Sequence, residues 1–307
     1  MNVSVAPVTH GGLTVAMARL LRPEGRARSL TQPGSWHGIG CQGLGLDGSV
    51  EPETWGRIWQ QSPVELAPEI SVDRLTLGWE IVFRAGYQQN GLWALGSPWV
   101  REAVERAQTE TVKSTLNKLD QAFRRVAGFE PDAEVGAPYA TFLAGTDESR
   151  IPRLRTIVLF PTDHTTADGT RLAVPDRIME RCGNALERVY NAELTQRTLD
   201  AFGDFGGPKT RIPPGLFVQV EDSPLLNGIA ANDHGLVPNG EECFTRWELR
   251  AALRGFGGED LAALLDETQS RFCVNPLSPH PSKGDAGIHK RAEGKSPQHR
   301  IDQGISL

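Results

Sequence analysis

The sequence predicts an α+β fold in which a central sheet is flanked by long helices. Two neighbouring runs, 139–142 and 154–160, are β-branched and apolar, and the second alternates as a strand does. Two longer stretches, about 98–127 and 175–202, carry apolar residues at helical spacing. A chain of 307 residues can bury a real core, either as one large domain or as two small ones.

The N-terminal part begins with a predicted amphipathic helix over 8–21. The segment 35–61 is then rich in glycine and ends in a short helix. Its glycines are interpreted as turn residues rather than as a phosphate-binding loop, because their spacing fits no nucleotide fingerprint. In that helix Trp55, Ile58 and Trp59 lie at helical spacing and are interpreted as core rather than as a base-stacking platform.

The clearest helix of the sequence is predicted at 98–127. Ser97 can cap this helix, Pro98 suits its first turn, and Gly128 stops it. About 30 residues correspond to a helix of ~45 Å. Its apolar positions are Val100, Val104, Ala107, Val112, Leu116, Leu119, Phe123 and Val126.

The C-terminal part starts with a hairpin turn at Asp168-Gly169 between 158–167 and 170–174. After the helix that ends before Gly203, a strand is predicted over 216–220. Two short helices follow, the first with a capping box from Thr245 to Glu248 and the second over about 260–272. We assign one domain to 1–272 and a disordered tail to 273–307, because apolar residues almost vanish from 275 onward.

The composition, 39% hydrophobic and 23% charged, is that of a soluble globular protein. A net charge of −6 argues against a protein that coats nucleic acid non-specifically. No signal peptide or membrane span is recognisable. The four cysteines (Cys41, Cys182, Cys243 and Cys273) form no C-x-x-C pair, which predicts reduced, buried thiols in a cytoplasmic protein.

Several motifs carry a resemblance to a known family. Residues 36–50 read Trp-x-Gly-x-Gly followed by Leu-Gly-Leu-x-Gly-x-Val, and 92–95 read Leu-Trp-Ala-Leu. Residues 183–194 are similar to a Gly-Ala-Leu-Tyr-x-x-Glu-Leu helix. These motifs resemble those of the TrwC/MobF-type conjugative relaxases, which nick single-stranded DNA. The resemblance covers roughly 8–202 and implies a mainly antiparallel sheet with both long helices on one face.

The resemblance also implies that catalytic positions of the family hold other residues here. The places of three metal-ligating histidines are taken by Ala144, Arg155 and Ile157, whose side chains offer a metal no lone pair. The family carries its nucleophilic tyrosines in the N-terminal region, whereas the first tyrosine of this chain is Tyr87. Glu80 replaces a catalytic Asp and remains as a vestigial candidate. We therefore expect no metal and no cofactor.

The resulting hypothesis is a relaxase-like protein of conjugative DNA mobilisation ancestry without nicking activity. One alternative is a non-catalytic domain that binds single-stranded DNA or acts as a protein scaffold. Another is an active nuclease with a rearranged site that uses Glu80, His10, His37 or His164. The expected partners are single-stranded DNA or a protein, with no membrane and no nucleotide.

Candidate DNA contacts are Arg84, Arg153 and Arg155, with Tyr87 as a possible stacking surface. A guanidinium at position 155 could hold a phosphate or could pair with Glu80 and close the former cleft. The paired arrangement is the favoured expectation, because an internal ion pair avoids leaving either charge buried alone.

Overall fold

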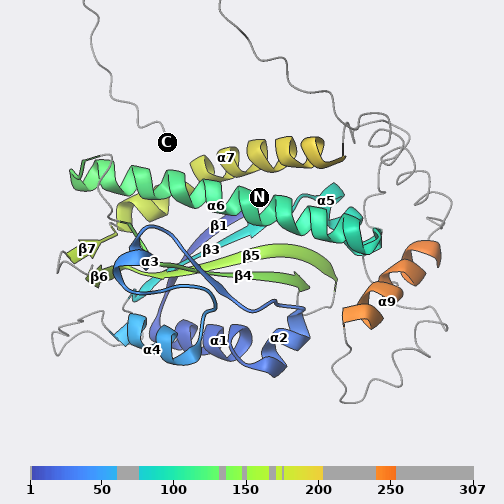
Figure 1. The fold of residues 1–307 in the computed structure, drawn as a ribbon, viewed down its shortest axis with the longest axis horizontal. Helices are drawn as coiled ribbons and strands as arrows, with labels where there is room; N and C mark the ends of the chain where they lie inside the picture. Colours follow the sequence, from blue (N-terminus) through green and yellow to red (C-terminus); the bar gives the residue numbers. More distant parts are fainter. Residues whose placement is uncertain are drawn as a thin grey trace, which may run out of the picture.

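The centre of the molecule is a five-stranded antiparallel sheet with the strand order β1-β3-β5-β4-β2 (Figure 1). This computed structural model describes residues 2–60, 76–130, 136–146, 151–165, 171–174, 176–202 and 240–253. The predicted antiparallel sheet is confirmed, and the runs predicted to lie at its middle are the neighbouring strands β4 and β5. The five strands are β1 (Val3–Val8), β2 (Ser35–His37), β3 (Gly78–Arg84), β4 (Tyr139–Thr146) and β5 (Pro152–Pro161).

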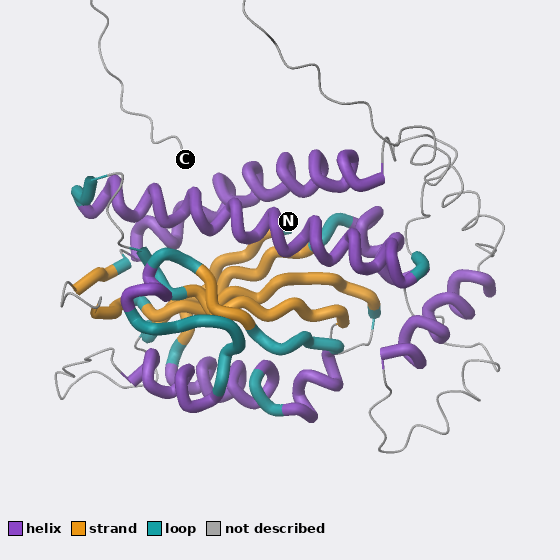
Figure 2. Tube along the Cα trace, in the orientation of Figure 1, coloured by secondary structure: helices purple, strands orange, loops and turns teal. Residues whose placement is uncertain are grey.

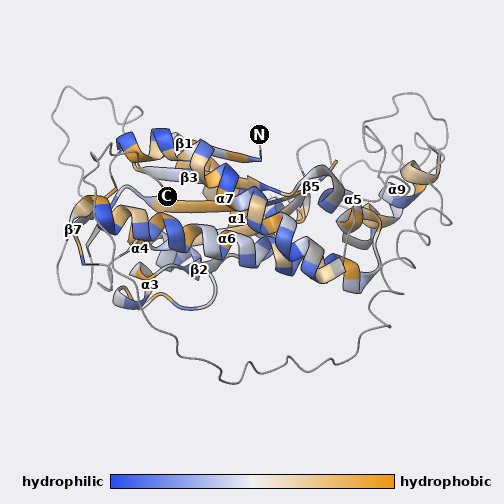
Figure 3. Ribbon diagram, turned by 90° about the horizontal axis from the view of Figure 1, so that it is seen from above, coloured by the Kyte–Doolittle hydropathy of each residue, from blue (hydrophilic) through white to orange (hydrophobic). Residues whose placement is uncertain are grey.

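Two long helices, α6 (Pro98–Ala127) and α7 (Asp176–Phe202), lie along one face of the sheet, which we call the α6 face (Figures 1 and 2). Polar and apolar residues alternate along both helices in Figure 3, as expected when one stripe packs and the other is solvated. Leu116, Leu119 and Phe123 of α6 share a core with Ile81, Phe83 and Val158 of the sheet. This arrangement confirms the prediction, although Val126 is exposed rather than packed.

The opposite face, which we call the α1 face, also carries helices, whereas the prediction had assigned helices to one face only (Figure 2). They are α1 (His10–Leu20), α2 (Pro23–Ser29) and α4 (Pro52–Gln60), with a short α3 (Gly40–Gly43) between α2 and α4 in the chain. Trp55, Ile58 and Trp59 of α4 are buried in the core of this face, as predicted. The ring centroid of Trp55 lies 5.9 Å from that of Phe142 on β4.

A third cluster joins α5 (Tyr87–Leu95) to α9 (Gly240–Leu253). Trp93 of α5 packs against Phe244 and Trp247 of α9, with ring centroids 5.2 and 5.4 Å apart. Since α9 begins at Gly240, Thr245 lies inside the helix, and its prediction as the start of the helix is wrong. Cys243 and Phe244 pack in this cluster, so the helix extends further towards its N-terminus than the capping signal suggested.

The predicted hairpin is present as β6 (Asp163–Thr165) paired antiparallel with β7 (Arg171–Ala173). Its turn at 168–169 lies outside the described residues, as do the predicted elements at 216–220 and 260–272 and the tail. Cys41, Cys182 and Cys243 are free and buried, and Cys273 is not described. Among the described helices, none combines the length and the apolar character that a membrane span requires.

Three glycines of the 35–61 segment have the backbone geometry that the sequence predicted. Gly38, Gly45 and Gly48 have φ angles of 100°, 62° and 67°, a region that other residues rarely adopt. Gly40 has a different role, because a Cβ there would lie 2.1 Å from the carbonyl oxygen of Gly136. These glycines are therefore required by the backbone path of this connection.

Candidate functional site

The positions that the resemblance selected gather on the α1 face of the sheet. Ala144 on β4 lies directly opposite Arg155 on β5, and Ile157 is two residues further along the same strand and face. Ile157 lies between Phe142 on one side and Val82 on the other. Register and alternation therefore place Ala144, Arg155 and Ile157 in one patch, which we call the ligand-position patch.

Apolar side chains dominate the ligand-position patch. Ala144 and Ile157 are 0% and 2% exposed and belong to the hydrophobic core of the α1 face. Arg155 is half-buried and donates a hydrogen bond from Nη2 to the carbonyl oxygen of Thr146, at 3.1 Å. Two hydrocarbon side chains and a guanidinium present no metal-binding lone pair.

Glu80 on β3 also faces α1, but its partner is not the predicted one. Its carboxylate lies 3.4 Å from Nη2 of Arg19 on α1. The expected pair between Glu80 and Arg155 is wrong, because β3 places Arg84 opposite Arg155 and Glu80 opposite Leu159. Four residues along a strand correspond to about 13 Å. Both members of the Arg19–Glu80 pair are more than a quarter exposed, so its contribution to stability is modest.

Arg19 is held in place by the packing of α2 on α1. Gly25 of α2 approaches α1 so closely that a Cβ would lie 2.3 Å from the carbonyl oxygen of Ala18 and 2.8 Å from Cα of Arg19. The N-terminal region, where the family resemblance places the nucleophilic tyrosines, thus contributes a guanidinium to Glu80. Sequence reasoning missed this pair, since residues 61 positions apart carry no local signal.

The candidate DNA contacts are brought together in part. Arg84 and Arg155 are directly opposed across β3 and β5, and Nη1 of Arg84 donates to Oγ of Ser4 at 2.9 Å. Arg153 is exposed and lies two residues before Arg155, beside a β-bulge between β4 and β5. We call these residues the arginine cluster. Tyr87 is the first residue of α5, but its side chain lies outside the described part of the structure.

The histidines considered for a rearranged nuclease site do not converge on Glu80 in the described residues. His10 is exposed at the first turn of α1. His37 lines a pocket with residues of α6, on the other face of the sheet from Glu80. His164 lies on β6, and its side chain is not described. Within the residues that the structure places, no three His, Cys, Asp or Glu side chains are grouped as a metal site would need.

The two described tyrosine side chains are also on the α6 face. The hydroxyl of Tyr139 donates to Oδ1 of Asp120 at 2.6 Å, and that of Tyr190 donates to Oε1 of Gln108 at 2.6 Å. Burial raises the pKa of both phenols, which disfavours the phenolate that attacks phosphorus. Neither group is exposed, so neither is accessible to a DNA backbone.

Comparisons with known proteins give matches to one family model and to several solved structures. The model of the TrwC relaxase family matches residues 27–203. Among solved structures, the conjugative relaxase TrwC in its metal-bound complex with oriT DNA superposes with a TM-score of 0.60. That match has 18% sequence identity and covers 82% of this chain and 98% of the other.

Two further TrwC complexes give similar values. The complex with a mutant oriT DNA has a TM-score of 0.57 and 19% identity, with 83% of this chain and 99% of the other covered. The complex with a 27-mer DNA, comprising the recognition hairpin and the cleavage site, has a TM-score of 0.55 and 18% identity, with coverages of 82% and 98%. Comparison with curated protein sequences gives no match.

Proposed function

Because the chain belongs to the TrwC relaxase family, we propose that it is a relaxase-like protein of conjugative DNA mobilisation ancestry that does not nick DNA. The observation that carries the proposal is the ligand-position patch, in which Ala144, Arg155 and Ile157 are neighbours on one face of the sheet. A metal site needs several lone pairs that converge from fixed positions. An apolar patch next to a guanidinium supplies neither the lone pairs nor a favourable field for a cation.

The tyrosines support the same proposal. Tyr139 and Tyr190 are buried on the α6 face with their hydroxyls committed to Asp120 and Gln108. Tyr87 is the remaining tyrosine of the sequence and therefore the one to test as a nucleophile. Glu80, which could assist proton transfer from a nucleophile, is instead paired with Arg19.

The test of this proposal is a nicking assay with single-stranded and supercoiled DNA in Mg²⁺ and Mn²⁺, beside an active relaxase as positive control. We expect no covalent protein–DNA adduct and no relaxed plasmid. Calorimetry of tag-free protein with Mn²⁺, Ni²⁺ and Zn²⁺ should show no binding tighter than ~10 μM, about −7 kcal/mol. An adduct that forms with the wild type and disappears in Tyr87→Phe would refute the proposal.

A second candidate function, binding of single-stranded DNA without cleavage, is favoured by the arginine cluster. Arg84 and Arg155 place two positive charges opposite each other on adjacent strands, and the Ser4 hydroxyl and the Thr146 carbonyl compensate them only in part. A guanidinium group can donate two parallel hydrogen bonds to one phosphate, and such a contact needs neither a metal nor a nucleophile. The net charge of −6 opposes binding, but only over a Debye length of about 8 Å at physiological salt.

Fluorescence anisotropy with labelled single-stranded and hairpin oligonucleotides tests this second function. We expect low-micromolar, salt-sensitive binding that weakens roughly tenfold in Arg155→Ala, because a charge-assisted contact to a phosphate is lost. Arg181→Ala is the matched control, since Arg181 is an exposed arginine of α7 on the other side of the sheet. If both variants bind DNA with equal affinity, the arginine cluster does not contribute to DNA binding. If neither the wild type nor either variant binds DNA, a protein scaffold is the hypothesis that remains.

A further inference from the structure

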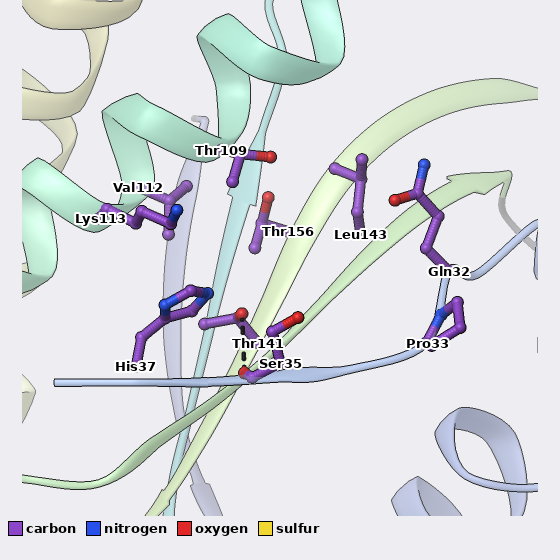
Figure 4. Close-up of a pocket in the computed structure, with 10 residues that line it drawn as sticks. All are labelled: Gln32, Pro33, Ser35, His37, Thr109, Val112, Lys113, Thr141, Leu143 and Thr156. Atoms are coloured by element: carbon purple, nitrogen blue, oxygen red, sulfur yellow. Dashed lines mark hydrogen bonds between the residues drawn. The ribbon is translucent and has the colours of Figure 1, made fainter. Parts of the chain in front are cut away.

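A small polar pocket lies on the α6 face, separated by the sheet from Glu80 and the arginine cluster (Figure 4). It has a volume of about 80 Å³ and is enclosed by the chain around β2, by β4 and β5, and by α6. The polar side chains that line it include Ser35, His37, Thr109, Lys113, Thr141 and Thr156. No local pattern predicts this pocket, because its residues come from four separate segments.

The hydrogen bonds around the pocket leave it rich in donors. Oγ1 of Thr156 accepts a hydrogen bond from Nε2 of Gln108 at 3.3 Å, so its own O–H is available to a ligand. Gln108 is fixed in this orientation, because its amide also donates to the carbonyl oxygen of Phe83 and accepts from Tyr190. Ser35 and Thr109 add hydroxyl groups to the lining. Thr141 is already committed, since its hydroxyl donates to the carbonyl oxygen of Ser35 at 3.1 Å.

One cationic side chain, Lys113, also lines the pocket. Lys113 lies 3.3 Å from the carboxylate of Glu110, but an ammonium group has three N–H donors and can hold a second anion. Burial lowers the pKa of His37, the charge of Lys113 lowers it further, and Glu110 acts in the opposite direction. Both of these nitrogen-bearing side chains line the pocket. Figure 4 shows them side by side at one end of the pocket.

The carboxylate of Glu105 is not part of the pocket lining, but it contacts Gln32, which is. Glu105 accepts hydrogen bonds from Nε1 of Trp93 at 2.8 Å and from Nε2 of Gln32 at 2.9 Å. Each of its oxygens therefore already accepts a hydrogen bond from the protein. The remaining polar groups of the lining are hydroxyls, an ammonium and an imidazole.

We propose that this pocket binds one phosphate-sized oxyanion, held by Lys113 and by the hydroxyls of Ser35, Thr109 and Thr156. About 10–15 Å³ of such volume suffices for one water, so 80 Å³ admits several waters or one tetrahedral anion. The anion is either free phosphate or the terminal phosphate of a nucleic-acid strand. The site is distinct from the proposed function, because it lies on the opposite face of the sheet from the ligand-position patch.

The first experiment is a titration of the full chain with sodium phosphate at constant ionic strength, followed by amide chemical shifts. We expect saturable shifts at β2 and in the middle of α6, with a Kd in the low-millimolar range, and at least a tenfold weaker Kd in Lys113→Met. Arg106→Met is the matched control, since Arg106 also pairs with a glutamate on the exposed side of α6 and is not part of the pocket lining. Thr109→Val, which removes one hydroxyl with little change of volume, should weaken binding a few-fold and serves if Lys113→Met does not fold.

The second experiment distinguishes the two sources of phosphate. Oligonucleotides of one sequence are compared with a 5′-phosphate and with a 5′-hydroxyl. Tighter binding of the phosphorylated strand that Lys113→Met abolishes assigns the pocket to strand ends, and equal binding assigns it to free phosphate. Shifts that do not saturate by about 50 mM phosphate, or equal affinity of wild type and Lys113→Met, overturn the proposal.

Discussion

Asp120 is a carboxyl group enclosed by the protein on every side. It is 0% exposed, and its Oδ1 accepts hydrogen bonds from the hydroxyl of Tyr139 and from the amide of Ala137, at 2.6 and 3.1 Å. Burial raises its pKa from 3.8 to about 6, although both hydrogen bonds and the charge of Arg124 act against the rise. The folded protein therefore holds this proton up to a pH at which the unfolded chain has lost it.

This predicts a pH-dependent stability. Because the folded state binds the proton more tightly, the free energy of unfolding should decrease as pH rises from about 4 to about 6, by up to about 3 kcal/mol. In Asp120→Asn the amide oxygen can accept both hydrogen bonds and carries no charge, so this decrease should vanish. Urea unfolding between pH 4 and 7 measures it, with the exposed Asp47→Asn as control. The prediction would be contradicted if the free energy of unfolding of the wild type changed with pH over this interval in the same way as that of Asp120→Asn.

Single residues also show which features of the site could be predicted from the sequence and which could not. The absence of lone pairs at 144, 155 and 157 was predictable, because it depends on side-chain chemistry alone. The partners of the charged residues were not, since Glu80 meets Arg19 rather than Arg155 through strand register and helix packing. The pocket at His37 and Lys113 was equally unpredictable, because it requires the crossing of α6 over β2 and β5.

At the scale of elements, long periodic segments were predicted best. The bounds of α6 and α7 agree with their apolar spacing. The C-cap of α6 is Gly128 with φ 77°, and the amide of the next residue, Phe129, donates to the carbonyl oxygen of Arg124. Strand β1 was missed. It is an edge strand with Pro7, and two of its residues are exposed, so it lacks the apolar alternation of β3 and β5.

The end of α6 gives a prediction at this scale, in which one chemical change has opposite effects at two sites. Gly128→Ala should destabilise the protein by about 1 kcal/mol, because a side chain is strained at this positive φ although the surrounding space is open. Gly56→Ala, inside α4 with equally open surroundings, should stabilise it by roughly 0.5–1 kcal/mol. Urea midpoints of both variants measure the difference. A change of the same sign in both would contradict it.

At the scale of the whole molecule, the sequence predicted the class of fold and the faces of the two long helices. It did not predict that the sheet is sandwiched, because the apolar spacing of the helices at 8–21 and 35–61 shows that they pack but not on which face of the sheet. The assignment of 1–272 to one domain remains a prediction, and so does the tail at 273–307. The domain lies partly, and the tail wholly, outside the described residues.

The tail prediction has a direct measurement. Trypsin should cleave first after Lys283, Lys290 and Arg291, while the far-ultraviolet circular dichroism stays unchanged, because a segment without a core opens at little cost in free energy. Amide exchange provides the internal control, since the amides of α6 should exchange orders of magnitude more slowly than those of the tail. Protection of 273–307 comparable to that of α6 would show a folded tail instead.

The central strand β5 has a consequence for how such a protein can change over generations. Thr156 lines the polar pocket of the α6 face, whereas its two chain neighbours, Arg155 and Ile157, point to the other side of the sheet. Substitutions at odd and even positions of one strand therefore act on separate surfaces. During evolution, the polar side chains of one surface can therefore be replaced one at a time while the contacts on the other surface stay the same.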